Sequence, residues 1–134
     1  MDILTPDKRS WNMSRIKSAN TKPEKAVRSL LHRMGYRFRL HAKYLPGKPD
    51  IVLPKYKSVI FVHGCFWHRH KNCKFAYIPK SRTDFWQRKF TSNVMRDNNN
   101  IKELHNRGWR VLVIWECELK DIENLKMSIA KFLD

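Results

Sequence analysis

Acidic residues are scarce in this 134-residue sequence. Twelve Asp and Glu residues stand against 28 Lys and Arg residues, so the formal net charge is +16. A surface of this sign binds polyanions by releasing their counterions, and the binding weakens as salt rises. The charge balance therefore predicts nucleic acid as the partner.

Long apolar runs, repeats and low-complexity tracts are also missing. No stretch is long or apolar enough to span a membrane or to lie in its surface, so an anionic membrane is a weaker candidate than nucleic acid. Residues 1–4 lack the features of a secretory signal, which predicts a cytoplasmic protein. The length fits one domain.

Cysteine occurs only three times, so the cysteines cannot all pair with one another. In a reducing compartment, a Cys and His cluster is more often a metal site than a disulfide framework. Cys65, His70 and Cys73 lie at spacings of five and three, and Cys117 follows a strand-like run. These four side chains suit a tetrahedral structural zinc ion. The alternative is three reduced thiols and an exposed histidine.

Hydrophobic periodicity predicts an α/β fold. Thr21 and Glu24 have capping-box spacing, and Gly35 supplies a helix stop. Polar residues 91–93 or 97–100 could interrupt the helix expected at 83–108. The expected elements are helix 21–35, strands 36–40, 50–53 and 59–62, helix 83–108, strand 109–115 and helix 121–133. We expect a single domain with a mixed central sheet flanked by helices, in which 109–115 is the central strand.

Strands 50–53 and 59–62 should form an antiparallel hairpin that brings Asp50 near His63. A carboxylate is a hard ligand suited to Mg²⁺, and a nearby histidine can take a proton from water that attacks a phosphodiester. His68 follows five residues after His63. The hypothesis is a metal-assisted hydrolytic site; the alternatives are a structural Asp at a strand edge and surface histidines.

Two further features favour a nucleic-acid interface. Phe66 and Trp67 stand among the Cys and His residues, where aromatic rings can stack on bases. Trp86 either joins them or packs inside its helix. Residues 1–20 form a basic segment without a sustained apolar period, which is either a DNA-binding arm or a disordered tail before a domain at 21–134.

The string HGCFWH at 63–68, with Pro49-Asp50 before it and WEC at 115–117 after it, closely resembles the very-short-patch-repair (Vsr) DNA mismatch endonucleases. The resemblance runs from about Met13 to Cys117. It implies a restriction-endonuclease-like fold and an enzyme that nicks duplex DNA 5′ of the thymine in a T·G mismatch, the product of 5-methylcytosine deamination.

The resemblance also implies residue roles. Asp50 and the backbone carbonyl of Val62 would bind Mg²⁺, His68 would be the general base oriented by Asp97, and Glu24 would lie near the same site. The implied zinc ligands are Cys65, His70, Cys73 and Cys117. The implied DNA contacts are Phe66, Trp67 and Trp86 from the major groove, and Met13 and Ile16 from the minor groove.

His63 stands where related nucleases carry the lysine of their PD-(D/E)xK motif, and Phe61 where they carry an acidic residue. Two positions depart from the family pattern. Val62 replaces an expected threonine, and two residues rather than one separate His70 from Cys73. The active site is therefore expected to be a variant with fewer carboxylates.

The partners implied are mismatched duplex DNA, a cytosine-5 DNA methyltransferase and mismatch-repair proteins, for a bacterial enzyme that is monomeric and associates with the nucleoid. Two alternatives remain. One is a related nuclease, of a restriction system or a mobile element, without mismatch preference. The other is a zinc-stabilised DNA-binding module without catalysis.

Overall fold

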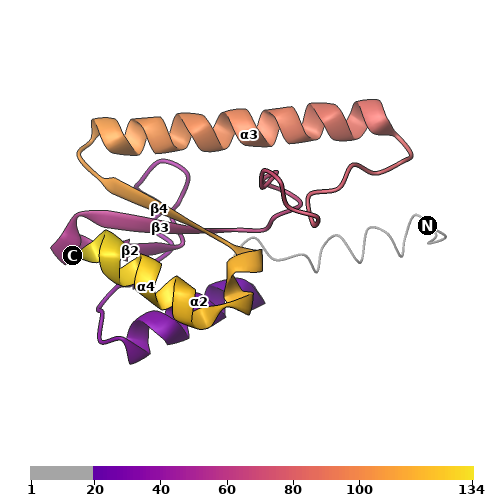
Figure 1. Ribbon diagram of the computed structural model, residues 1–134. Coiled ribbons are helices and arrows are strands. Elements are labelled where there is room, and N and C mark those ends of the chain that lie inside the picture. Colours follow the sequence, from indigo (N-terminus) through magenta and orange to yellow (C-terminus); the bar gives the residue numbers. More distant parts are fainter. Residues whose placement is uncertain (1–19) are drawn as a thin grey trace.

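In the computed structural model, which describes residues 20–134, a four-stranded mixed sheet lies between two layers of helices (Figure 1). The sheet order is β1-β2-β3-β4, formed by Arg39–Leu40, Ile51–Leu53, Ser58–His63 and Arg110–Trp115. The helices are α2 (Lys22–Arg33), α3 (Thr83–Asn106) and α4 (Ile122–Leu133), with 3₁₀ turns η1 (Pro54–Tyr56) and η2 (Glu116–Lys120). The predicted single α/β domain with helices on both faces of the sheet is confirmed.

Local sequence signals set the boundaries of α2. The Thr21 hydroxyl accepts the backbone N–H of Glu24, and a proline occupies the first turn. Gly35 follows the helix with φ of +88°, a conformation that a side chain would strain. Val27, Leu30 and Leu31 are buried on one face of the helix. The predicted capped helix is confirmed.

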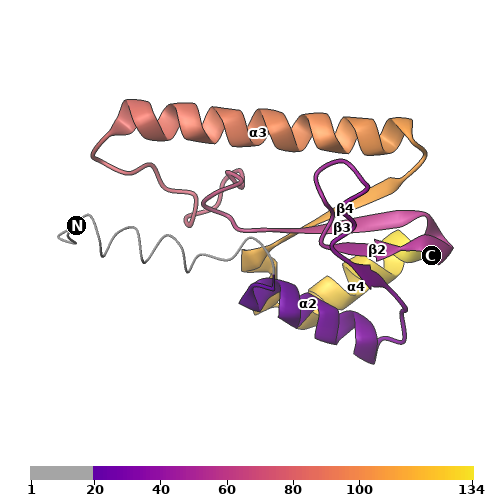
Figure 2. The same cartoon turned by 180° about the vertical axis from the view of Figure 1, so that it is seen from behind.

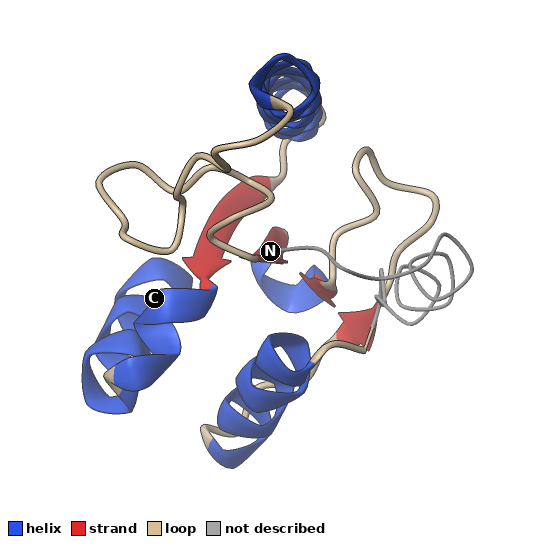
Figure 3. Ribbon diagram, turned by 90° about the vertical axis from the view of Figure 1, so that its right-hand side faces the viewer, coloured by secondary structure: helices blue, strands red, loops and turns tan. Residues whose placement is uncertain are grey.

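Strand alternation divides the core between the two faces of the sheet. Ile51, Leu53 and Ile60 belong to the cluster that α2 and α4 cover. Val52, Val59 and Phe61 belong to the cluster that contains Leu104 of α3. The view in Figure 3 shows α3 on one side of the sheet and the other two helices on the opposite side. Each face of the sheet therefore has its own core.

The predicted antiparallel hairpin is confirmed, because β2 pairs with β3 with Ile51 opposite Ile60. The prediction that 109–115 is the central strand is wrong. Within residues 20–134, β4 pairs with β3 alone, in parallel, and forms an edge of the sheet. The apolar side chains of β4 are explained by the helices that cover both faces of the sheet. An edge strand covered in this way needs apolar residues just as a central strand does.

The long helix α3 is continuous from Thr83 to Asn106, so the predicted interruption at 91–93 or 97–100 is wrong. Only Phe90 and Leu104 are buried along it, and most of its other residues are exposed or half-buried. An asparagine in a helix costs less than about 0.7 kcal/mol relative to alanine, too little to break a helix held by tertiary packing. Figure 2 shows it running above the 64–82 loop.

The part of the chain described by the structure contains no helix long and apolar enough to cross a membrane. The segment 1–19, with Met13 and Ile16 of the predicted DNA-binding arm, lies outside the described residues.

Candidate functional site

Asp50 directly precedes β2 and is fixed by the neighbouring strand. Its Oδ2 accepts a 2.7 Å hydrogen bond from the backbone N–H of Val62. Burial raises the pKa of Asp50 to about 6, while the Val62 N–H opposes the rise and the nearby Glu24 carboxylate adds to it. Above that pH the side chain is a carboxylate held beside the strand end, which is the chemistry a divalent cation needs.

Glu24 reaches the same place from α2 and is 3% exposed. Its Oε2 accepts the backbone N–H of Asn20 at 3.0 Å and lies 3.0 Å from Nη2 of Arg28 and 3.2 Å from Nε2 of His41. Glu24, His41 and Asp50 each offer a ligand atom within 4.8 Å of the others. Glu24 thus makes a capping-type contact with the Asn20 N–H and also lies beside Asp50.

A second group of polar side chains joins the end of β3 to the middle of α3. The rings of His63 and His68 are stacked, 3.8 Å apart with an interplanar angle of 7°. Nδ1 of His68 lies 2.7 Å from Oδ2 of Asp97. An ionised carboxylate only accepts hydrogen bonds, so Nδ1 donates and the neutral ring carries its lone pair on Nε2. That nitrogen is suited to act as a general base.

His63 differs chemically from His68 because it is enclosed. It is 6% exposed, and burial together with the adjacent His68 lowers the pKa of His63 to about 4. The ring is therefore neutral at physiological pH. A neutral His63 cannot supply positive charge to a phosphate.

We expect His63 to stay neutral far below the ordinary histidine range. In an NMR titration of the protein without added Mg²⁺, its ring resonances should move with a midpoint near pH 4. Assignment by the variant His63→Gln identifies the signal. A His63 midpoint above pH 6 would contradict the enclosed, neutral ring.

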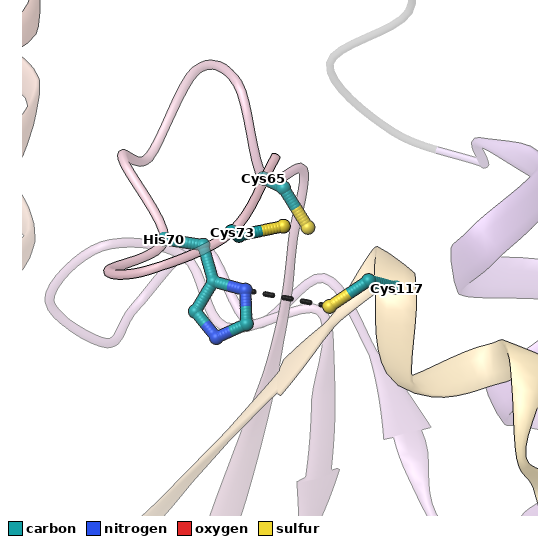
Figure 4. A group of neighbouring side chains, drawn as sticks. All are labelled: Cys65, His70, Cys73 and Cys117. Carbon is teal, nitrogen blue, oxygen red and sulfur yellow. Dashed lines mark hydrogen bonds between the residues drawn. The ribbon is translucent and has the colours of Figure 1, made fainter. Parts of the chain in front are cut away.

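The predicted zinc ligands come together from two distant segments. Cys65, His70, Cys73 and Cys117 each offer a ligand atom within 4.8 Å of the others, with Nδ1 of His70 3.4 Å from Sγ of Cys117 (Figure 4). Burial raises the pKa of Cys65 to about 12 and also raises the pKa of Cys117. A backbone hydrogen bond from Phe75 lowers the pKa of Cys73.

This donor set fits a tetrahedral zinc ion, because Zn–S bonds of about 2.3 Å place the ligand atoms roughly 4 Å apart. The His70 ring stacks on Trp115 of β4 at 4.2 Å, which fixes its orientation. Cys117 lies in η2, directly after β4. A metal here would tie the 64–82 loop to the sheet.

Aromatic rings gather between that loop and α3. Phe66 packs edge-on against Trp67, Trp86 and Phe90 at 5.1 to 5.7 Å. Phe66, Trp67 and Trp86 are half-buried, while Phe90 is buried. Nδ2 of Asn93 donates to the Trp67 carbonyl at 3.2 Å, so α3 also fixes the loop backbone. Trp86 therefore joins Phe66 and Trp67, the other two aromatic residues predicted to contact DNA, rather than packing inside the protein.

Sequence reasoning missed three residues of this region: His41, Arg28 and Arg69. Arg69 donates to the carbonyls of Phe66, Ala76 and Tyr77, and its guanidinium lies 3.8 Å from the Phe90 ring centre. These contacts fix the conformation of the 64–82 loop. The only available signal for His41 was its place after strand 36–40, opposite Asp50 in an antiparallel pair.

Comparisons with known proteins find DNA endonucleases similar to this chain. The model of the family described as DNA mismatch endonuclease Vsr matches residues 1–74. The chain is 52% identical to the type II nicking enzyme V.XorIIP of Xanthomonas oryzae pv. oryzae, over 99% of this chain and 97% of that protein. It is 45% identical to the DNA mismatch endonuclease Vsr of Escherichia coli K12, over 92% and 79%.

Among solved structures, the catalytic domain of the homing endonuclease I-Bth0305I superposes with a TM-score of 0.60 at 29% identity. The superposition covers 84% of this chain and 94% of that domain.

Proposed function

Because the chain belongs to the Vsr family of DNA mismatch endonucleases, we propose that it nicks duplex DNA 5′ of the thymine in a T·G mismatch, with Mg²⁺ bound at Asp50. The family membership itself makes the protein a DNA endonuclease. The observation that carries the specific proposal is that β3 positions both groups at its end: the Asp50 carboxylate accepts the backbone N–H of Val62, and the His68–Asp97 pair stacks on His63, the next residue.

The mechanism begins with a water molecule beside His68. Asp97 holds the His68 ring with Nδ1–H toward α3, so Nε2 takes the proton of the water as it attacks the phosphorus. The phosphorus–oxygen bond to the leaving nucleoside breaks in the same step, and the departing oxygen takes a proton from solvent. The neutral His63 ring stacks on His68 and keeps its plane fixed. A magnesium ion would be held by Asp50 and the Val62 carbonyl, and it supplies charge stabilisation on the phosphate. Glu24 would lie beside the same cation.

Selectivity for a mismatch is proposed to reside in the aromatic cluster. Phe66, Trp67 and Trp86 are apolar wedges of the kind that unstack a base step. Unstacking costs a few kcal/mol and is cheapest at a mismatched pair. Met13 and Ile16 would approach from the minor groove on the segment 1–20. The net charge of +16 favours binding to the DNA backbone.

The cellular context follows from this substrate. T·G mismatches arise where 5-methylcytosine is deaminated, so the enzyme would act with a cytosine-5 DNA methyltransferase and alongside mismatch-repair proteins. We place it in the bacterial cytoplasm, as a monomer that associates with the nucleoid through DNA. The Cys65, His70, Cys73 and Cys117 cluster would hold structural Zn²⁺.

A nicking assay on two duplexes that differ only in T·G or C·G tests the proposal. With Mg²⁺, we expect the T·G duplex to be cut on the thymine strand at least about 10²-fold faster, because a few kcal/mol of unstacking cost separate the two. EDTA should abolish cutting. The measurement is strand cleavage on a denaturing gel, with each strand labelled separately.

The other outcomes separate the alternatives. Equal cutting of both duplexes would replace the repair function with that of a nuclease without mismatch preference, which the likeness to a homing endonuclease catalytic domain makes a real alternative. Binding without cutting of either duplex would indicate a DNA-binding module.

A further inference from the structure

His41 follows the edge strand β1 and lies opposite Asp50, which precedes the neighbouring strand β2. Its backbone N–H donates to the Asp50 carbonyl at 3.2 Å, which extends the β1–β2 ladder by one residue. Its φ of +46° turns the chain at this point into the loop that leads to Pro49. The backbone of β1 therefore places the imidazole beside the residue proposed to bind the catalytic cation.

The His41 side chain points to the two carboxylates. Nε2 lies 3.2 Å from Oε2 of Glu24, and His41, Glu24 and Asp50 each offer a ligand atom within 4.8 Å of the others. Neighbouring ligands of an octahedral ion with bonds of about 2.1 Å lie roughly 3 Å apart. The Glu24–His41 separation therefore matches one edge of such a coordination sphere.

The donor types of these three residues differ from an all-oxygen site. Carboxylates and carbonyls suit Mg²⁺, whereas an imidazole nitrogen suits transition metals. A set of one nitrogen and two carboxylates favours ions such as Mn²⁺ and Co²⁺. The His41 side chain is 27% exposed and that of Glu24 is 4% exposed, so a cation can enter from the His41 side.

We propose that His41 is a further ligand of the active-site cation, with Glu24 and Asp50, and that its Nε2 gives this site an affinity for Mn²⁺ beyond that of an all-oxygen Mg²⁺ site. The inference rests on the proposed role of Asp50 as a metal ligand. It assigns to this chain a nitrogen donor in addition to the proposed carboxylate and carbonyl oxygens.

Arg28 competes with such an ion. Its Nη2 lies 3.0 Å from Oε2 of Glu24, 3.2 Å from Nε2 of His41 and 2.8 Å from Oδ1 of Asn20. A divalent ion that binds Glu24 and His41 takes over these two contacts, while the contact with Asn20 can persist. The guanidinium thus neutralises the Glu24 carboxylate until the ion binds.

Pulsed EPR of Mn²⁺ bound to the full-length protein without DNA tests the nitrogen ligand directly. With ¹⁵N-labelled histidine, we expect a ¹⁵N coupling to Mn²⁺ that is lost in His41→Gln. The control His32→Gln removes an exposed histidine at the end of α2 and should keep the coupling. Absence of a ¹⁵N coupling in the wild-type protein would overturn the proposal, whatever the variants do.

Calorimetric titration supplies the affinities. His41→Gln should weaken Mn²⁺ binding by about tenfold or more and Mg²⁺ binding by less than about threefold, because only the transition metal favours the nitrogen donor. Equal weakening of both ions, or none, would assign His41 a purely structural contact with Glu24. Unchanged thermal unfolding of the variant excludes misfolding as the cause.

The same proteins in the nicking assay keep the two proposals apart. If wild-type protein nicks the T·G duplex with Mg²⁺ but shows no ¹⁵N coupling, the further inference fails and the proposed function stands. If Mn²⁺ binds through His41 but neither ion supports nicking, the metal ligand stands and the proposed function fails.

Discussion

The variant Asp50→Asn is expected to lose nicking almost completely. A bound metal stabilises the charge that develops on phosphate by several kcal/mol, which corresponds to a rate loss of about 10³-fold or more. Asn keeps the shape of Asp and can still accept the 2.7 Å hydrogen bond from Val62, so the strand pairing should survive. The measurement is single-turnover cleavage of a T·G duplex at saturating enzyme.

Binding of DNA provides the internal control for Asp50→Asn. The variant should bind the duplex at least as tightly as the wild type, because a half-buried negative charge at the proposed phosphate site is removed. Glu123→Gln changes the net charge by the same amount on α4, where the Glu123 side chain is 85% exposed, and should cut normally. A nicking rate in Asp50→Asn within a few-fold of wild type would remove Asp50 from the mechanism.

Loss of the zinc cluster should have the largest effect on stability. Elemental analysis should find about one zinc per chain, and a structural zinc ion contributes several kcal/mol or more to folding. His70→Ala should lower the melting temperature by about 10 °C or more, since roughly 4 °C follow from each kcal/mol in a domain of this size. Nicking should fall as well, because the 64–82 loop carries His68 and Trp67.

His105→Ala is the matched control for His70→Ala, since it removes an exposed histidine from the last turn of α3. It should leave the melting temperature nearly unchanged. Cys117→Ala should reproduce the loss seen in His70→Ala, because Cys117 connects the cluster to the end of β4. If purified protein contains no zinc and the variants melt like the wild type, the cluster is a set of reduced thiols.

Much of the fold was predictable because the signals are local. The Thr21 cap, the proline in the first turn and the helical spacing of Val27 and Leu30 predicted α2 within a few residues. The turn between 53 and 58 predicted the β2–β3 hairpin, since short connections join antiparallel neighbours. The edge position of β4 was not predictable in this way. Its parallel pairing with β3 follows a connection of 46 residues, and apolar content reports burial rather than strand order.

In the candidate site, too, some features were predictable from local sequence and others were not. The residue types in HGCFWH, with Asp50 before it and Cys117 after it, were sufficient to predict a hydrolytic site and a zinc cluster, and the structure brings those groups together. Their roles remain predictions. His41 and Arg69 carried no spacing signal, because their contacts depend on how loops pack against Glu24 and Phe90.

By itself, the sequence determined the kind and order of most helices and strands, the hairpin, the donor chemistry and the charge that favours DNA, although the predicted strand 36–40 is reduced to Arg39–Leu40 in the structure. These depend on side-chain type and on neighbours a few residues apart. Only the tertiary structure decided the sheet order, the continuity of α3, the neutral state of His63 and the position of His41 beside Glu24. Each of these depends on burial and contact between segments distant along the chain, which no local pattern encodes.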